Sequence, residues 1–405
     1  MQRKISTKVL FVLVFLTLST ALKASVQYRL EDFEEKGLKG GLSYVRVNGK
    51  NFAKVGLSPD LQLGAVGVGL DLNAYIPTDG GAVPSSLQSV VVRSVSYDHN
   101  HQAGIKWGRL TRVNFGYGLL MNNYDSGSFG SVEFNNEKAG TLLYGTYGDL
   151  RVDALWTASN VKGGRISYTL PESIFLGSPI VFGANYVTDA DGINRVTEAG
   201  TIVSRNIQST IGFDIAAPIG GEFFTLYAEY AQFREQGQGS GASAGFKGSF
   251  SNQLDYRLEY RSLGAKFVPG YFNSVYEATS FNFNNDAPKG TLSGVLGGVG
   301  FGLMDNYLKA DLVYEAYQGF NPLLTAAVGW KKMSNTVGVI NYSKPFSSGG
   351  NAVAEANILY YTGGLFDYVA TIKRVYTTND LFTESYAIGA RVNLSSLFPN
   401  IPFIK

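Results

Sequence analysis

The chain has no cysteine among its 405 residues. This absence excludes a disulfide-stapled scaffold, a thiolate metal site, a cysteine nucleophile and a lipid attached to an N-terminal cysteine. Charge is also scarce, because 16% of the residues are charged, whereas about 25% is usual in a soluble domain. Beyond the N-terminus no run of about 18 apolar residues occurs, which excludes membrane-spanning helices.

Histidine is almost absent, with only His99 and His101. On a strand, alternate residues share one face, so the two imidazoles could hold a divalent metal, but no third ligand is evident. They are weak metal candidates, and a polar loop or strand end is the alternative. A hydrolase would need a histidine beside a serine or an acid, and the glycines from Gly294 to Gly302 lack the lysine of a phosphate loop. We therefore expect no enzymatic activity and no cofactor.

The N-terminus has the layout of a secretory signal peptide. Arg3, Lys4 and Lys8 precede an apolar run over residues 9–18, and small and polar residues follow up to Ala24. An N-terminal anchor helix is the alternative, but the apolar run is too short to span a bilayer. Removal of residues 1–24 takes away four positive charges and no negative ones, so the formal net charge falls from +2 to −2. A nearly neutral chain gives no support for nucleic-acid binding.

Apolar and polar residues alternate along much of the remaining chain. Between Leu254 and Leu263, leucine and tyrosine occupy one face, and aspartate, arginine and glutamate occupy the other. This period of two predicts two-faced β-strands, since a helix would scatter the same charges around its axis. The same pattern recurs in residues 151–157, 207–215, 224–230, 308–316 and 385–394.

The N-terminal third alternates less clearly. Residues 61–76, 103–110 and 115–124 are glycine-rich and apolar, and we interpret them as strands, with a bend near Gly116 and Gly118. Residues 235–245, rich in Gly, Gln and Ser, are predicted to form a flexible loop.

Short and longer connections alternate in the last third of the chain. Asp305-Asn306, Ser334-Asn335 and Gly363-Gly364 indicate tight turns, and longer polar links lie around residues 319–322, 347–351 and 377–383. Counting back from the final strand places the short turns on the rim that also carries the C-terminus. Asn48-Gly49 predicts a two-residue hairpin near the N-terminus.

These features predict an all-β fold, a transmembrane antiparallel up-and-down β-barrel of about 14–18 strands. Strands of about 9–12 residues can cross a membrane at a tilt, and no repeat of about 40 residues suggests propeller blades. A soluble exported β-protein that buries its apolar face is the alternative. Aromatic residues near strand ends favour the membrane interpretation, because interfacial girdles place them there: Tyr307, Tyr360, Tyr361, Tyr368 and Tyr376.

The last alternating segment resembles the C-terminal assembly signal of bacterial outer-membrane β-barrel proteins. Gly389, Val392 and Leu394 match its glycine and its two apolar positions, whereas Ala387 stands where a polar residue is preferred. The chain also continues to Lys405, while many such proteins stop on an aromatic residue. The resemblance implies a porin-like protein, integral to the outer membrane and recognised by the barrel-assembly machinery. No specific characterised family is indicated.

The expected organisation is a signal peptide at 1–24, a periplasmic leader or plug segment at 25–40, the barrel at 41–398 and a tail at 399–405. The expected function is passive diffusion of small hydrophilic solutes, and a homo-oligomer in the lipid bilayer is compatible with the sequence. A structural or adhesive barrel without transport, or an uptake channel for apolar compounds, is the alternative. Charges of both signs are expected on inward faces and predict weak ion selectivity; the pore-lining candidates are Asp255, Arg257, Glu259, Arg261, Lys309, Asp311 and Glu315.

Overall fold

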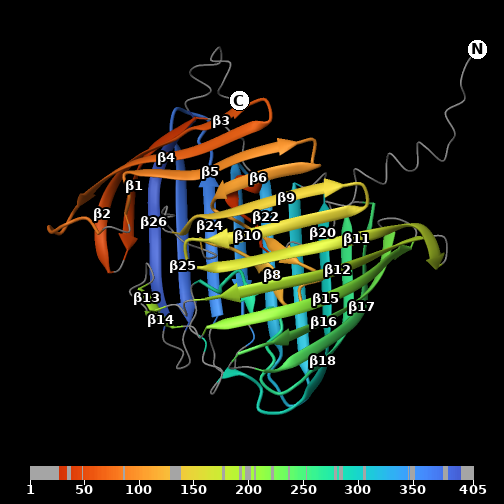
Figure 1. The fold of residues 1–405 in the computed structure, drawn as a ribbon. Helices are drawn as coiled ribbons and strands as arrows, with labels where there is room; N and C mark the ends of the chain where they lie inside the picture. The colour runs from red at the N-terminus through yellow and green to blue at the C-terminus, as the bar shows by residue number, and fades with distance from the viewer. Residues whose placement is uncertain are drawn as a thin grey trace, which may run out of the picture.

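The structure, a computed structural model, is a closed barrel of antiparallel strands (Figure 1). It describes residues 27–33, 38–47, 49–84, 87–127, 138–175, 178–190, 194–196, 202–204, 207–219, 223–235, 238–251, 253–277, 281, 286–303, 307–344, 346, 352–376 and 382–393. The expected signal peptide and C-terminal tail lie outside the described residues. Within these ranges no helix is long and apolar enough to cross a membrane.

The wall is built from the alternating segments. Its strands are β1 (Lys39–Val47), β2 (Lys50–Ser58), β3 (Asp60–Leu63), β4 (Val66–Pro77), β5 (Val90–His99), β6 (Ala103–Gly108), β9 (Gly140–Tyr147), β10 (Leu150–Thr157), β11 (Val161–Phe175), β12 (Ser178–Asp189), β15 (Gln208–Ile219), β16 (Phe224–Phe233), β17 (Ser240–Phe250), β18 (Leu254–Leu263), β20 (Leu292–Leu303), β21 (Leu308–Tyr317), β22 (Leu323–Met333), β23 (Thr336–Ser343), β24 (Ala352–Tyr360), β25 (Asp367–Tyr376) and β26 (Phe382–Asn393).

The barrel closes because β26 pairs with β1, with Lys39 opposite Asn393. Closure leaves no sheet edge with unpaired backbone groups. Pro59 separates β2 from β3, which both pair with β4 and count as a single interrupted strand, since proline cannot donate a ladder hydrogen bond. The described residues thus form a ring of 20 strands. This exceeds the 14–18 expected, because the connections on one rim consume fewer residues than the estimate allowed.

Connection length differs sharply between the two rims. On the rim that carries the end of β26, the connections are short and span residues 64–65, 100–102, 148–149, 176–177, 220–223, 251–253, 304–307, 334–335 and 361–366. All of the longest connections lie on the opposite rim, at residues 78–89, 109–139, 190–207 and 264–291. Outer-membrane barrels have short periplasmic turns and longer extracellular loops. The predicted placement of the short turns on the C-terminal rim is confirmed.

The two faces of the wall differ as the alternation predicted. On β18, Leu258 is 48% exposed and Tyr260 57% exposed, while Glu259 and Arg261 between and beyond them are 1% and 2% exposed. Register carries this division to the neighbouring strands, because β-pairing keeps opposite residues on one face: Arg257 lies opposite Lys247 on β17 and Gly298 on β20. Apolar side chains therefore cover the outside and polar ones point into the lumen.

Two of the long connections fold inward and partly fill the lumen. The first contains β7 (Val113–Phe115) and β8 (Met121–Tyr124), and the second contains β19 (Phe272–Asn273), which pairs parallel to β8. Their side chains form an apolar cluster with inward residues of the wall, including Leu155, Val187, Phe233 and Leu263. A separate hairpin, β13 (Asn194–Val196) and β14 (Ile202–Ser204), lies in another long connection.

Three interpretations of the sequence need correction. Residues 61–76 are not one strand but the hairpin of β3 and β4, turning at Gly64, whose φ of 61° favours glycine. Residues 115–124 leave the wall, although the bend is present, with φ of 66° at Gly116 and 92° at Gly118. Residues 240–245 belong to β17 rather than to a loop.

Candidate functional site

The inward charges of β18 form one network with neighbouring strands. Arg261 donates from Nε to Glu259 at 2.5 Å and from Nη1 to Glu315 of β21 at 2.9 Å. Arg257 also pairs with Glu259, which accepts a hydrogen bond from the hydroxyl of Tyr227 at 2.6 Å. Charges withdrawn from water need such partners, since an unpaired buried charge is strongly unfavourable. This network is part of the wall beneath the inward connections.

The first inward connection is held to this wall by charge-assisted hydrogen bonds. Glu229 on β16 accepts hydrogen bonds through Oε2 from the backbone N–H groups of Tyr117 (3.2 Å) and Leu119 (2.9 Å). Arg257 donates to the carbonyl oxygen of Tyr117 at 2.5 Å. A segment without regular pairing has free backbone groups, and here the wall satisfies them. Gly116 is required at the contact, because a Cβ there would lie 2.4 Å from Glu229 Oε1.

The ring of Tyr117 adds an aromatic contact to these hydrogen bonds between the first inward connection and the wall. It stacks on Tyr227 with ring centroids 4.3 Å apart and planes within 8°. The ammonium group of Lys247 lies 4.6 Å from the centre of the same ring, a cation–π geometry. Burial and the nearby carboxylate of Asp214 raise the pKa of the Tyr117 phenol above its ordinary value. The phenol therefore stays neutral and does not repel Glu229.

The second inward connection is fixed by buried carboxylates. The hydroxyl of Tyr276 donates to Asp189 at the end of β12 at 2.6 Å. Glu277 accepts hydrogen bonds from the hydroxyls of Tyr124 (2.7 Å) and Ser159 (2.8 Å), so it joins both inward connections to the turn after β10. The two connections therefore form a single structure that narrows the lumen toward the rim with the long connections.

Residues 27–33, which precede β1, also lie inside the barrel. The side chain of Asn341 on β23 accepts a hydrogen bond from the backbone N–H of Tyr28 (2.9 Å) and donates to its carbonyl oxygen (2.8 Å). Phe33 packs against Gly329 of β22, where a Cβ would lie 2.2 Å from the ring. We refer to residues 27–33 as the N-terminal segment.

Electrostatic contacts connect the N-terminal segment to the first inward connection. Arg29 pairs with Asp125, which is 3% exposed, and Arg109 Nε lies 3.6 Å from the same carboxylate. Burial alone would raise the pKa of Asp125, but the two guanidinium groups and the backbone N–H of Gly127 hold that pKa below its ordinary value. Asp125 is therefore ionised at neutral pH and attracts the N-terminal segment.

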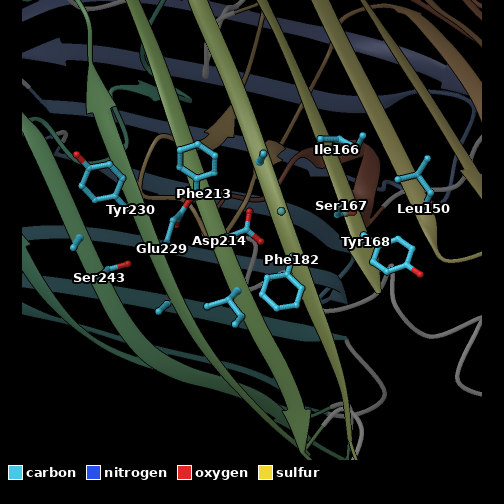
Figure 2. Close-up of a pocket in the computed structure, with 15 residues that line it drawn as sticks. Leu150, Ile166, Ser167, Tyr168, Phe182, Phe213, Asp214, Glu229, Tyr230 and Ser243 are labelled. Atoms are coloured by element: carbon cyan, nitrogen blue, oxygen red, sulfur yellow. The ribbon is translucent and has the colours of Figure 1, made fainter. Parts of the chain in front are cut away.

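The outer face of the barrel is apolar where the structure has a shallow surface pocket over β10, β11, β12, β15, β16 and β17 (Figure 2). Phe182, Phe213 and Tyr230 line it at outward positions and are 45%, 50% and 40% exposed. Asp214 directly follows Phe213 on β15, and Glu229 directly precedes Tyr230 on β16, so both carboxylates point to the luminal side, where they are buried. Exposed aromatic residues also mark both rims, with Tyr307 and Tyr368 at one and Trp156 and Phe382 at the other. An apolar band between aromatic girdles fits a lipid bilayer and not water.

The chain is an antiparallel β-barrel protein of porin-like architecture whose outer face fits a lipid bilayer. No protein-family profile and no curated protein match its sequence. Solved structures with a similar fold include the outer-membrane protein OpdK of Pseudomonas aeruginosa, 9% identical, covering 88% of this chain and 97% of OpdK with a TM-score of 0.37. OccK5 (OpdH) of the same organism is 13% identical, with 88% and 97% coverage and a TM-score of 0.38. The outer-membrane channel DcaP of Acinetobacter baumannii is 12% identical, with 88% and 95% coverage and a TM-score of 0.28.

All seven charged residues singled out in the sequence of this barrel protein occupy inward positions. The structure brings Arg257, Glu259, Arg261 and Glu315 together in one network. Asp311 lies apart from them, is 8% exposed and lies near the hydroxyl of Tyr28. Asp255 lies opposite Gly300 on one side of β20, and Lys309 lies opposite Gly302 on its other side, both near the C-terminal rim.

The remaining candidates lie away from the lumen narrowing. His101 is exposed in the turn after β5, where its Nδ1 lies 2.7 Å from Asp98, and His99 ends that strand. No cluster of three potential metal ligands occurs among the residues that the structure describes. Gly389 and Val392 lie in β26, opposite Ser43 and Gly40 of β1, while Leu394 is outside the described residues.

Sequence reasoning missed the residues that narrow the lumen: Tyr117, Glu229, Asp125, Asn341 and Arg29. Glu229 was visible as an inward position of an alternating strand, but nothing local indicates that it binds a backbone 110 residues away. The clearest available signal was Gly116-Tyr117-Gly118, where an aromatic residue stands between two glycines in a segment with weak alternation.

Proposed function

We propose that this barrel protein is a channel for passive diffusion of small hydrophilic solutes across the outer membrane. The observation that supports the proposal is a wide ring of strands whose inward faces carry charged and polar side chains, narrowed by two connections that the wall holds in defined positions. Inward polar faces keep a barrel lumen hydrated, and inward loops set its effective diameter.

The inward charges support weak ion selectivity. Glu259 and Glu315 together balance the charges of Arg257 and Arg261 inside the wall network, so these arginines add little net field to the lumen. Asp255 and Lys309, of opposite sign, face the lumen nearer the C-terminal rim. We also propose that Gly389 and Val392 belong to the signal read by the barrel-assembly machinery, and that homo-oligomers form through the apolar outer face.

The test is single-channel recording of the purified protein in planar lipid bilayers. We expect discrete conductance steps and only a small reversal potential in a salt gradient. Detergent extract from cells that lack the protein is the control. Folded protein, identified by a shift between boiled and unboiled gel samples, that produces no steps and no solute flux into liposomes would show a barrel without transport.

Uptake of apolar compounds is a second candidate, favoured by one observation. The inward connections and the wall share an apolar cluster that includes Phe115, Phe267 and Phe272, and the N-terminal segment lies beside the lumen wall. Apolar ligands bind in such aromatic surroundings. Liposome flux separates the candidates, because a diffusion channel passes small sugars and ions, whereas an apolar uptake channel passes hydrocarbons or aromatic compounds with little sugar flux.

A further inference from the structure

We propose that the place occupied by the N-terminal segment is a binding site for short peptides that carry an arginine and an aromatic residue, and that the segment is its displaceable internal occupant. The inference rests on the proposed channel function and deepens it by naming a solute class. Four separate contacts of residues 27–33 support it.

The first contact is a pair of hydrogen bonds to the peptide backbone and not to a side chain. Asn341 is 1% exposed, and its carboxamide both accepts from the N–H and donates to the C=O of Tyr28. A neighbouring β-strand would offer one residue the same pair of hydrogen bonds. Any peptide residue with a free N–H and C=O can satisfy this asparagine, whereas a simple ion cannot both donate and accept.

The second contact selects an aromatic side chain. Phe33 is 4% exposed and packs with Ala327, Val337, Val339 and Leu359 on the inner faces of β22, β23 and β24. Tyr28 meets the same ring edge to face, with centroids 5.4 Å apart. Gly329 provides the space for the ring, because a Cβ at this position would lie 2.2 Å from Phe33. The wall therefore has a recess that fits an aromatic ring.

The third contact selects a positively charged side chain, and the fourth selects a polar side chain at the first residue of the peptide. Arg29 pairs with the buried carboxylate of Asp125, which the backbone N–H of Gly127 also stabilises at 3.0 Å. The side chain of Gln27 donates to the hydroxyl of Ser274 in the second inward connection. These contacts place a bound peptide against both inward connections, in the narrowed part of the lumen.

The segment can leave without disrupting the barrel. The hydrogen bonds that hold it to the wall involve side chains, and residues 27–33 pair with no wall strand. If the signal peptide is removed after Ala24, as the sequence predicts, the segment lies next to a free chain end. A peptide of the same chemistry can then compete for the site and, once bound, lies within the passage.

The experiment uses the full mature chain in planar bilayers. The variant R29E/F33S changes only the N-terminal segment and removes its charge and aromatic contacts. The exterior variant R374E serves as control, because Arg374 pairs with Glu384 on the outer face. The probes are the synthetic peptide QYRLEDF, which has the sequence of residues 27–33, and QYELEDS, which carries the same two changes as the variant.

We expect severalfold higher conductance from R29E/F33S than from the wild-type protein and R374E. QYRLEDF should block R29E/F33S reversibly, and QYELEDS should block it at least severalfold more weakly. In liposomes, Arg-Phe dipeptides should enter through the wild-type channel severalfold faster than Gly-Ser dipeptides.

Equal block by the two peptides, or none, with normal conductance would overturn the peptide site and leave the channel standing. Silence of every folded variant would instead overturn the channel. If R29E/F33S fails to fold on the gel, the wall variant N341L supplies the same comparison. N341L should conduct more than the wild-type protein and bind QYRLEDF more weakly. Conductance and peptide block in N341L equal to those of the wild-type protein would overturn the site.

Discussion

Glu229 should hold the first inward connection in place, and its replacement by leucine tests this role. The substitution removes the acceptor of the backbone N–H groups of Tyr117 and Leu119. An unsatisfied buried donor costs about 1–3 kcal/mol, so the docked connection loses roughly 2–6 kcal/mol in total. Relief of the like charge on Asp214, which lies opposite Glu229, returns about 0.2–1 kcal/mol. The docked state should therefore weaken by at least about 1 kcal/mol, or roughly fivefold, since 1.4 kcal/mol corresponds to a factor of ten.

The absence of cysteine makes the assay direct. A single cysteine at Asn114, which is exposed on the inward connection, can carry a nitroxide spin label. We expect a restrained spectrum in the otherwise native protein, a mobile component in Glu229→Leu, and an intermediate result in Glu229→Gln, which retains one acceptor oxygen. Thr225→Val, at an inward position of the same strand, should leave the spectrum unchanged.

The barrel itself should survive the substitution, because the ladder of β16 with β15 and β17 does not depend on Glu229. The gel shift on boiling should therefore persist, and conductance should become larger or noisier. An immobile label together with native conductance in Glu229→Leu would refute the reasoning, since the connection would then be held by packing alone.

Three further predictions concern the lumen. Gly329→Ala should expel Phe33 and raise conductance, because the added Cβ would lie 2.2 Å from its ring; native conductance would contradict this. The depressed pKa of Asp125 means that its carboxylate favours docking of Arg29 above its ordinary pKa and loses this effect as pH falls through the depressed pKa. Conductance should therefore rise below about pH 4, Asp125→Asn should show the rise at neutral pH, and a flat pH profile in the native protein would argue against it. Lys309→Glu should move the reversal potential toward cation preference, and an unchanged potential would exclude Lys309 from selectivity.

The wall of the barrel could be predicted from sequence because a membrane barrel faces two different solvents. Lipid outside and a polar lumen inside impose a period of two, and β18 and β21 were located by this period alone. The prediction failed where the inner face meets protein instead of water. On β17, Gly241 faces Phe267 of the second inward connection, and a Cβ there would lie 2.5 Å from the ring. Gly241 thus reflects close packing in a strand and not a flexible loop.

The interior could not be predicted because its contacts join residues that are far apart in the chain. Asn341 and Tyr28 are separated by 313 positions, and Glu229 and Leu119 by 110. A single sequence gives no distance between such residues, and their types alone fit many surface positions. Local sequence did mark Gly116 and Gly118, whose positive φ values turn the chain inward. The local sequence could not show which wall residues would hydrogen-bond to that turn.

The arginines of β18 have a different role in the structure from the one that the sequence alone predicts. From alternation alone, Arg257 and Arg261 are pore-lining charges, and their reversal to glutamate should shift ion preference. In the structure both pair with Glu259, and Arg261 is 2% exposed. The double reversal would put four carboxylates, with Glu315 among them, in place of two and remove both cations of the network. Such buried like charges typically destabilise a protein by several kcal/mol. The double variant would therefore test the integrity of the wall, and selectivity is better tested at Lys309, which lies outside the network.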